Sequence, residues 1–188
     1  MSTSALLRAR RIVVRQTNWV GDVIMTTPAL ARLRRLNPEA RITVLARKPL
    51  TTLLENNPDV DDLWTLDDRT RSGWWEAVRR LRRARFDVGL VLANSTRSAL
   101  LLRMGGVSPL RGYAREGRRW LLGEPVPAPD SLLSTHDVLY YLRLLNALDS
   151  SGGDPAPGDP PLRYFVREEE RLEAPRLLAE AGFAPDQP

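Results

Sequence analysis

Short apolar runs alternate along the chain with longer stretches in which apolar residues recur every three or four positions. The short runs are rich in β-branched residues, which is typical of strands that are buried on both faces of a sheet. They predict strands at Arg11–Arg15, Arg41–Ala46, Leu63–Leu66, Phe86–Leu92, Leu110–Tyr113 and Leu162–Val166.

The longer stretches predict helices between these strands. One begins near Asp22, a short one covers Pro49–Glu55, and a third runs from Trp74 to Arg85 with arginines on its surface side. Further helices are predicted over Ser95–Met104, from the capping residues Ser134 and Thr135 to Leu148, and over Glu168–Ala181. Strands that alternate with helices favour an α/β fold, a doubly wound parallel sheet covered on both faces.

A segment rich in Ser, Gly, Asp and Pro, Ser150–Pro161, is predicted to be a loop or linker. We therefore expect one α/β domain over residues 1–150, followed over 151–188 by a linker, a strand and a helix that lead toward a second domain. The final residues, Gly182–Pro188, resemble the approach to a new element, so we expect the sequence to be part of a longer protein.

Composition narrows the possible chemistry. The absence of cysteine excludes disulfides and thiolate metal sites, and a single histidine, His136, gives little basis for a histidine metal site or triad. A thiolate or histidine metal site is therefore not expected, and we predict no cofactor. No apolar run reaches the ~18 residues of a membrane span, and arginines interrupt any signal-peptide core near the N-terminus. We expect a cytoplasmic protein.

The formal net charge is +5, and every basic residue except Lys48 is an arginine. A positive protein raises the local concentration of anionic partners. Nucleic acid, phosphorylated sugars and anionic lipid headgroups all satisfy this condition, so charge alone does not choose between them.

The stretch RQTNWVGDVIMTTPAL, from Arg15 to Leu30, joins the first strand to the first helix through a tight turn. Gly21 would permit a positive φ or the close approach of a ligand, and the helix start offers unpaired N–H groups. An acidic residue there, Asp22, is expected to have a lowered pKa. Two interpretations stay open: Asp22 caps the helix, or it accepts a proton from a bound hydroxyl. The glycine patterns of dinucleotide-binding and P-loop sites are absent.

Other polar residues follow predicted strands and so share the same sheet edge. Asn94 and Ser95 either cap the next helix or line a ligand crevice there. Arg111 and the arginines behind it either clamp phosphate or carboxylate groups or form a solvated face. These following arginines are Arg115, Arg118 and Arg119.

Two further features favour structural roles. His136 is expected to be a helix-start residue with local hydrogen bonds, and the Trp74–Trp75 pair is expected to supply one core and one surface side chain.

Four segments together resemble the lipopolysaccharide heptosyltransferases, most of all heptosyltransferase II. They are NWVGDVIMTTPAL (Asn18–Leu30), LANSTRSAL (Leu92–Leu100), RGYAREGRRWLL (Arg111–Leu122) and HDVLYYLRLL (His136–Leu145). The second departs from the family pattern by having Ala93 in place of proline. The matches fall in the family's order and cover most of Arg11–Leu148.

The resemblance implies the N-terminal, acceptor-binding half of a GT-B glycosyltransferase, in which two Rossmann-like domains face each other across a cleft. It implies an inverting transfer of heptose from ADP-heptose to the inner core on lipid A, without a metal. The donor would bind to a second domain. Asp22 would be the general base, with Asn18, Gly21, Asn94 and Ser95 lining the cleft. The arginines from Arg111 onward would bind anionic groups of the acceptor.

The resemblance also implies that the basic helix from Arg79 to Arg85 would rest on anionic lipid at the cytoplasmic face of the inner membrane. Two other classes remain open on the sequence. A nucleic-acid-binding module would also be basic, although no helix-turn-helix, zinc or aromatic RNA-binding signature is present. A free-standing, noncatalytic α/β module would bind an anionic partner through an exposed face.

Overall fold

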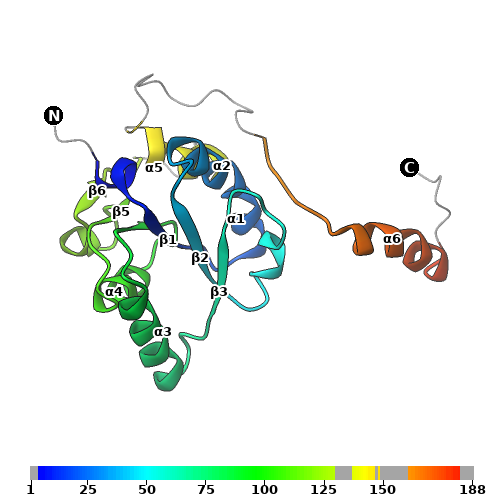
Figure 1. Ribbon diagram of the computed structural model, residues 1–188, viewed down its shortest axis with the longest axis horizontal. Coiled ribbons are helices and arrows are strands. Elements are labelled where there is room, and N and C mark those ends of the chain that lie inside the picture. Colours follow the sequence, from blue (N-terminus) through cyan, green and yellow to red (C-terminus); the bar gives the residue numbers. More distant parts are fainter. Residues whose placement is uncertain (1–3, 130–136, 147, 149–160, 183–188) are drawn as a thin grey trace.

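The computed structural model describes residues 4–129, 137–146, 148 and 161–182. Its centre is a six-stranded, all-parallel sheet with the order β3-β2-β1-β4-β5-β6 (Figure 1). The strands are β1 (Arg11–Arg15), β2 (Arg41–Arg47), β3 (Asp62–Leu66), β4 (Val88–Val91), β5 (Leu110–Tyr113) and β6 (Glu124–Val126). This order is that of a doubly wound dinucleotide-binding sheet, so the predicted fold class is confirmed.

Helices pack on both faces of the sheet (Figure 1). One face carries α1 (Val20–Met25), α2 (Thr27–Leu36) and α5 (Asp137–Asn146), which contact one another. The other carries α3 (Arg71–Ala84) and α4 (Thr96–Met104). Short 3₁₀ turns lie at Ala5–Arg8, Thr52–Leu54 and Arg118–Leu121. The last helix, α6 (Glu168–Glu180), extends away from the sheet and has no buried residue.

The two faces have separate hydrophobic cores because side chains alternate along each strand. Ile12 and Val14 of β1 belong to the core beneath α1, α2 and α5. Val13 belongs to the core with Trp74, Val78 and the other apolar residues of α3 and α4. By the same alternation, the side chain of Arg15 lies on the face covered by α3 and α4. It can therefore reach Asp68, in the loop before α3.

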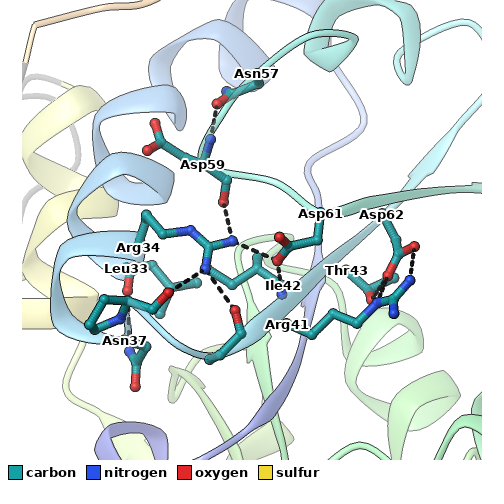
Figure 2. Close-up of polar contacts among 12 residues, drawn as sticks. Leu33, Arg34, Asn37, Arg41, Ile42, Thr43, Asn57, Asp59, Asp61 and Asp62 are labelled. Carbon is teal, nitrogen blue, oxygen red and sulfur yellow. Dashed lines mark hydrogen bonds and ion pairs between the residues drawn. The ribbon is translucent and has the colours of Figure 1, made fainter.

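Arginine–carboxylate contacts fasten the amino ends of β2 and β3 to α2 (Figure 2). The guanidinium of Arg34 donates to the carboxylate of Asp61 at 2.6 Å and to the Ala40 carbonyl at 2.7 Å. Arg41 and Asp62 form a two-pronged pair at 2.6 and 2.9 Å. These contacts hold the edge of the sheet opposite the carboxyl ends of the strands, so they are structural.

Three sequence predictions about elements differ from the structure. Residues 161–167 contain no strand, because this mostly exposed segment pairs with neither edge of the sheet. The predicted helix at Pro49–Glu55 is reduced to a three-residue 3₁₀ turn after a cis peptide at Pro49. The edge strand β6 was not predicted, since Glu124-Pro125-Val126 is short and Pro is tolerated only at an edge.

Candidate active site at the carboxyl edge of the sheet

The strand order reverses direction between β1 and β4, and in open α/β sheets the ligand crevice lies beyond the carboxyl ends of the strands at this point. Arg15 and Val91 are partners in the register of these two strands. The β1–α1 turn, with Asn18, Gly21 and Asp22, and the β4–α4 turn, with Asn94 and Ser95, therefore flank this switch point, where the rule places a ligand crevice. The topology brings five of the predicted site residues to the same edge.

A buried arginine holds the β1–α1 turn. Arg15 has no exposed surface, and its guanidinium donates to the Gln16 carbonyl at 2.5 Å and to the side-chain oxygen of Asn18 at 3.1 Å. Gln16 is also buried and donates to the Thr26 hydroxyl at 2.8 Å. Because both ends of the turn are tied to fixed elements, the backbone before Asp22 is rigidly positioned.

Asp68, in the loop between β3 and α3, is the acidic centre of this edge. Its carboxylate accepts from Arg47 at 2.7 Å and lies 3.5 Å from the guanidinium of Arg15, and its backbone carbonyl accepts from Arg97 at 2.5 Å. Burial alone would raise the pKa of Asp68, but the hydrogen bond from Arg47 and the charges of Arg15, Arg47 and Arg97 outweigh it and leave the pKa lowered. Three arginines from different chain segments thus contact Asp68, two of them at its ionised carboxylate and one at its backbone carbonyl.

Asp22 is the third residue of α1, and Trp19 occupies the N-cap position, so the capping interpretation of Asp22 is wrong. Its half-buried carboxylate makes no hydrogen bond within the described part of the chain. The expected lowering of its pKa is also wrong. Burial, and secondarily the negative charge of Asp137 at the start of α5, raise the pKa of Asp22. The loss of hydration outweighs the helix dipole here, which makes Asp22 a stronger base than a solvated aspartate.

Gly21 is an exposed residue within the first turn of α1, and its φ is not positive. An added Cβ would meet only the terminal methyl of Met25, at 3.6 Å. The backbone conformation therefore does not require glycine at this position. What glycine provides is open space beside Asp22.

In the β4–α4 turn, Ser95 and Asn94 have different structural roles. Ser95 is the N-cap of α4, where its hydroxyl accepts from the Ser98 amide at 3.2 Å. Asn94 is half-buried, and its side-chain oxygen accepts from the Tyr140 hydroxyl at 2.8 Å. Ser95 thus has the capping role, while Asn94 joins the crevice to α5.

Two of the predicted anion-binding arginines are buried and form their hydrogen bonds inside the protein. Arg111 donates to the Leu144 carbonyl at 2.6 Å and lies 3.3 Å from the carboxylate of Glu124, and burial lowers its pKa. Arg118 is fully buried and donates to the carbonyls of Tyr113 and Ala93, at 2.8 and 2.5 Å. Both arginines brace the turns around the crevice. Arg115 is half-buried and Arg119 is exposed.

A surface pocket of about 330 Å³ opens at the carboxyl ends of β3 and β4. Its lining contains three arginines and two tryptophans: Arg69, Thr70, Arg71, Trp74, Trp75 and Arg97. The Arg97 guanidinium lies 4.2 Å from the ring centroid of Trp74, a cation–π distance. Trp74 belongs to the core and Trp75 is half-exposed, as predicted. We call this site the arginine–tryptophan pocket; its composition suits an anionic ligand.

The described part of the chain has neither a metal cluster nor a membrane-spanning helix. It contains no group of three or more acidic, histidine or cysteine side chains that could hold a metal ion. None of its helices has the length and apolar character needed to span a membrane. His136, Ser134 and Thr135 lie outside the described residues.

Comparison with known proteins identifies the chain's relatives. Residues 74–171, just over half of the chain, match glycosyltransferase family 9 (heptosyltransferase). The chain belongs to this family. Within glycosyltransferase family 9, it is 29% identical over 123 residues to lipopolysaccharide heptosyltransferase 2 of Escherichia coli K12, a match that covers 61% of this chain and 34% of the relative. It is 27% identical over 119 residues to lipooligosaccharide heptosyltransferase 2 of Haemophilus ducreyi, with the same coverage.

Solved family 9 structures share the fold. A family 9 glycosyltransferase from Veillonella parvula superimposes with a TM-score of 0.79 and 25% identity, over 98% of this chain and 52% of that one. The ADP-heptose lipopolysaccharide heptosyltransferase II of E. coli gives 0.73 and 24%, over 95% and 52%. This chain therefore spans about a third of the curated relatives and about half of the solved ones.

The sequence did not point to Arg15, Asp68 or Arg97 as site residues. A usable signal existed for Asp68, because it follows a predicted strand at the same edge as Asp22 and Asn94. Arg15 gave a weaker signal, as a charged residue directly after the apolar run Ile12–Val14. Their pairing depends on the order of the strands, which the sequence pattern does not supply.

Proposed function

We propose that this family 9 chain is the acceptor-binding half of an inverting glycosyltransferase that moves heptose from ADP-heptose to the inner core of lipopolysaccharide. Asp22 is the general base in this proposal. Three of the relatives matched above are heptosyltransferases by name, and one of them is named for ADP-heptose. A second, donor-binding domain would complete the cleft, and the reaction would take place at the cytoplasmic face of the inner membrane.

The single observation that carries the catalytic assignment is the state of Asp22. Its half-buried carboxylate stands at the switch-point crevice with a raised pKa and no hydrogen bond to the described residues. A general base needs a free lone pair that points at its substrate and a pKa shifted toward the working pH. In an inverting displacement this base removes the acceptor's proton on the side opposite the leaving group. Asp68, locked between arginines, lacks the free lone pairs for this task.

The arginine–tryptophan pocket supports an anionic acceptor. Guanidinium groups bind carboxylate and phosphate in a two-pronged manner, and inner-core sugars on lipid A carry both kinds of group. Arg97 and Trp74 form one wall, and Arg69 and Arg71 supply two more cations. Asn18, Asn94 and the space beside Gly21 would line the path from this pocket to Asp22. Arg111 would act indirectly, by bracing β5 against α5.

The test is Asp22→Asn in the full-length protein. Turnover is expected to fall by about 10²–10⁴-fold, while the affinity for ADP-heptose stays unchanged. The melting temperature is expected to hold or to rise slightly. The pKa of Asp22 is higher in the folded than in the unfolded state, so ionisation costs stability once the pH exceeds the unfolded value, and asparagine removes this cost.

Asp137→Asn is the matched control. It removes the same charge from the start of α5, beside Asp22, and should leave turnover at high pH intact. The acidic limb of its rate profile should move to lower pH, because a negative neighbour that raises the pKa of Asp22 is gone. A well-folded Asp22→Asn enzyme with normal turnover would retire the base assignment. Anion binding without any transfer by the full-length protein would instead favour the noncatalytic binding module.

A further inference from the structure

The exposed side of α3 carries a row of arginines that ends in a tryptophan. Trp75, Arg79, Arg82 and Arg83 fall at positions i, i+4, i+7 and i+8, which is one side of an α-helix. All four are exposed, and the opposite side of the helix is buried through Trp74, Val78 and Leu81. We call the four exposed residues the α3 basic face.

This face has no matching acidic partner in the part of the chain that the structure describes. None of its three arginines is in an ion pair there, and Arg82 donates only to a backbone carbonyl, that of Met104. Glu76 is the single acidic residue of α3. The guanidinium charges are therefore available to an external anion.

We propose that the α3 basic face docks the protein on the surface of an anionic lipid bilayer. A straight row of cations on the outer side of a helix matches a plane of phosphate headgroups, which attract each basic residue near the surface. Trp75, half-exposed at the end of the row, supplies the amphipathic ring that settles at the boundary between headgroups and acyl chains. Single-stranded nucleic acid would also satisfy the charges and stack a base on Trp75, so its binding is one of the outcomes that the test distinguishes.

The continuity of the basic face with the arginine–tryptophan pocket supports the same partner. Trp75 belongs to both, and the pocket opens at the N-terminal end of α3. A protein docked along α3 would hold this pocket at the membrane surface, where the polar head of a lipid-anchored acceptor lies. α3 and α6 lie in well-separated parts of the molecule (Figure 1), so α6 does not cover the face. The reason for docking rests on the proposed function, while the docking itself does not.

The experiment is flotation of the chain with two kinds of vesicle, phosphatidylcholine mixed with phosphatidylglycerol and phosphatidylcholine alone. The test variant is Arg79→Gln with Arg83→Gln, which spares the Arg82 hydrogen bond. The matched control is Arg8→Gln with Arg171→Gln, which removes two exposed charges from other surfaces. We expect binding to mixed vesicles alone, weakened roughly 25-fold in the test variant, about fivefold per arginine, and unchanged in the control. Trp75→Ala should also weaken binding. Added salt should not reproduce this effect, because salt screens the charges and leaves the apolar contact of the ring in place.

Equal losses in the test and control variants would overturn the proposal, since net charge alone would then explain binding. Equal binding to both kinds of vesicle would overturn it as well. So would tighter binding of single-stranded nucleic acid that the same two substitutions abolish. Transfer to a delipidated, water-soluble acceptor is measured separately. Docking and the proposed function can therefore fail independently of each other.

Discussion

Replacing Asp68 with asparagine removes one negative charge from a site where three arginines converge. Asp68 is 3% exposed and Arg15 is fully buried, so Arg15 would be left as an uncompensated cation. Breaking a buried ion pair by removing one partner costs about 3–5 kcal/mol. Asparagine still accepts the hydrogen bond from Arg47, which favours the lower end of this range. For a chain of this size the melting temperature should fall by roughly 6–20 °C.

The control is Asp62→Asn. The Asp62–Arg41 pair has shorter contacts than the Asp68–Arg15 pair, but the Arg41 side chain is 63% exposed. Its loss should leave the melting temperature nearly unchanged, because water screens exposed pairs. Thermal unfolding followed by circular dichroism compares the two variants. If they melt together, burial is not what makes the Asp68 network strong and the reasoning fails.

The pKa of Asp68 also predicts the pH dependence of this contribution. Its folded-state pKa lies below the unfolded value, so the stabilisation is fully present above the unfolded pKa of about 4 and is lost as the pH falls through the folded pKa. The stability difference between wild type and Asp68→Asn should therefore shrink in acid, as denaturant titrations would measure. Ser95→Ala should cost about 1 kcal/mol through the loss of the α4 cap, seen as a lower urea midpoint. Gly89→Ala should cost about 1–3 kcal/mol in the same assay, because its Cβ would lie 2.6 Å from the Leu110 side chain. Gly21→Ala should raise the midpoint slightly, because alanine favours the helix and fits at this position, and it should weaken acceptor binding. Intact acceptor affinity would show that the space beside Asp22 is not used.

Local sequence patterns predicted the elements of this fold well where a single segment determines them. The β1 and β5 runs and the α3 stripe were recognisable because burial on both faces, or on one side of a helix, leaves a strong periodic signal. Leu162–Val166 has the composition of a strand but lacks a neighbouring strand to pair with. Whether a run becomes a strand depends on that distant partner, so the pattern alone was insufficient.

In the site, too, the features set by local sequence were predictable and those set by distant segments were not. The edge that carries Asp22 and Asn94 was predictable, because parallel strands bring their carboxyl ends together. The pKa of Asp22 was not, since it depends on burial in the packed structure and on the charge of Asp137, which lies in α5 more than a hundred residues along the chain. Arg111 and Arg118 looked like surface cations, and only the packed structure revealed that backbone carbonyls surround them.

The choice of arginine over lysine inside this domain has a consequence for its behaviour in a changing cell. Burial lowers the pKa of Arg15 to about 10, which still leaves the guanidinium protonated throughout the physiological range. An ammonium group begins with a pKa about two units lower, so the same desolvation would bring the pKa of a lysine there close to neutral pH. Such a lysine would lose its proton whenever the pH rose slightly, and its hydrogen bonds to the turn before Asp22 would then weaken. With arginine, the contacts of the guanidinium with Gln16 and Asn18 persist across the physiological pH range, so a change of pH within that range leaves the turn before Asp22 in place.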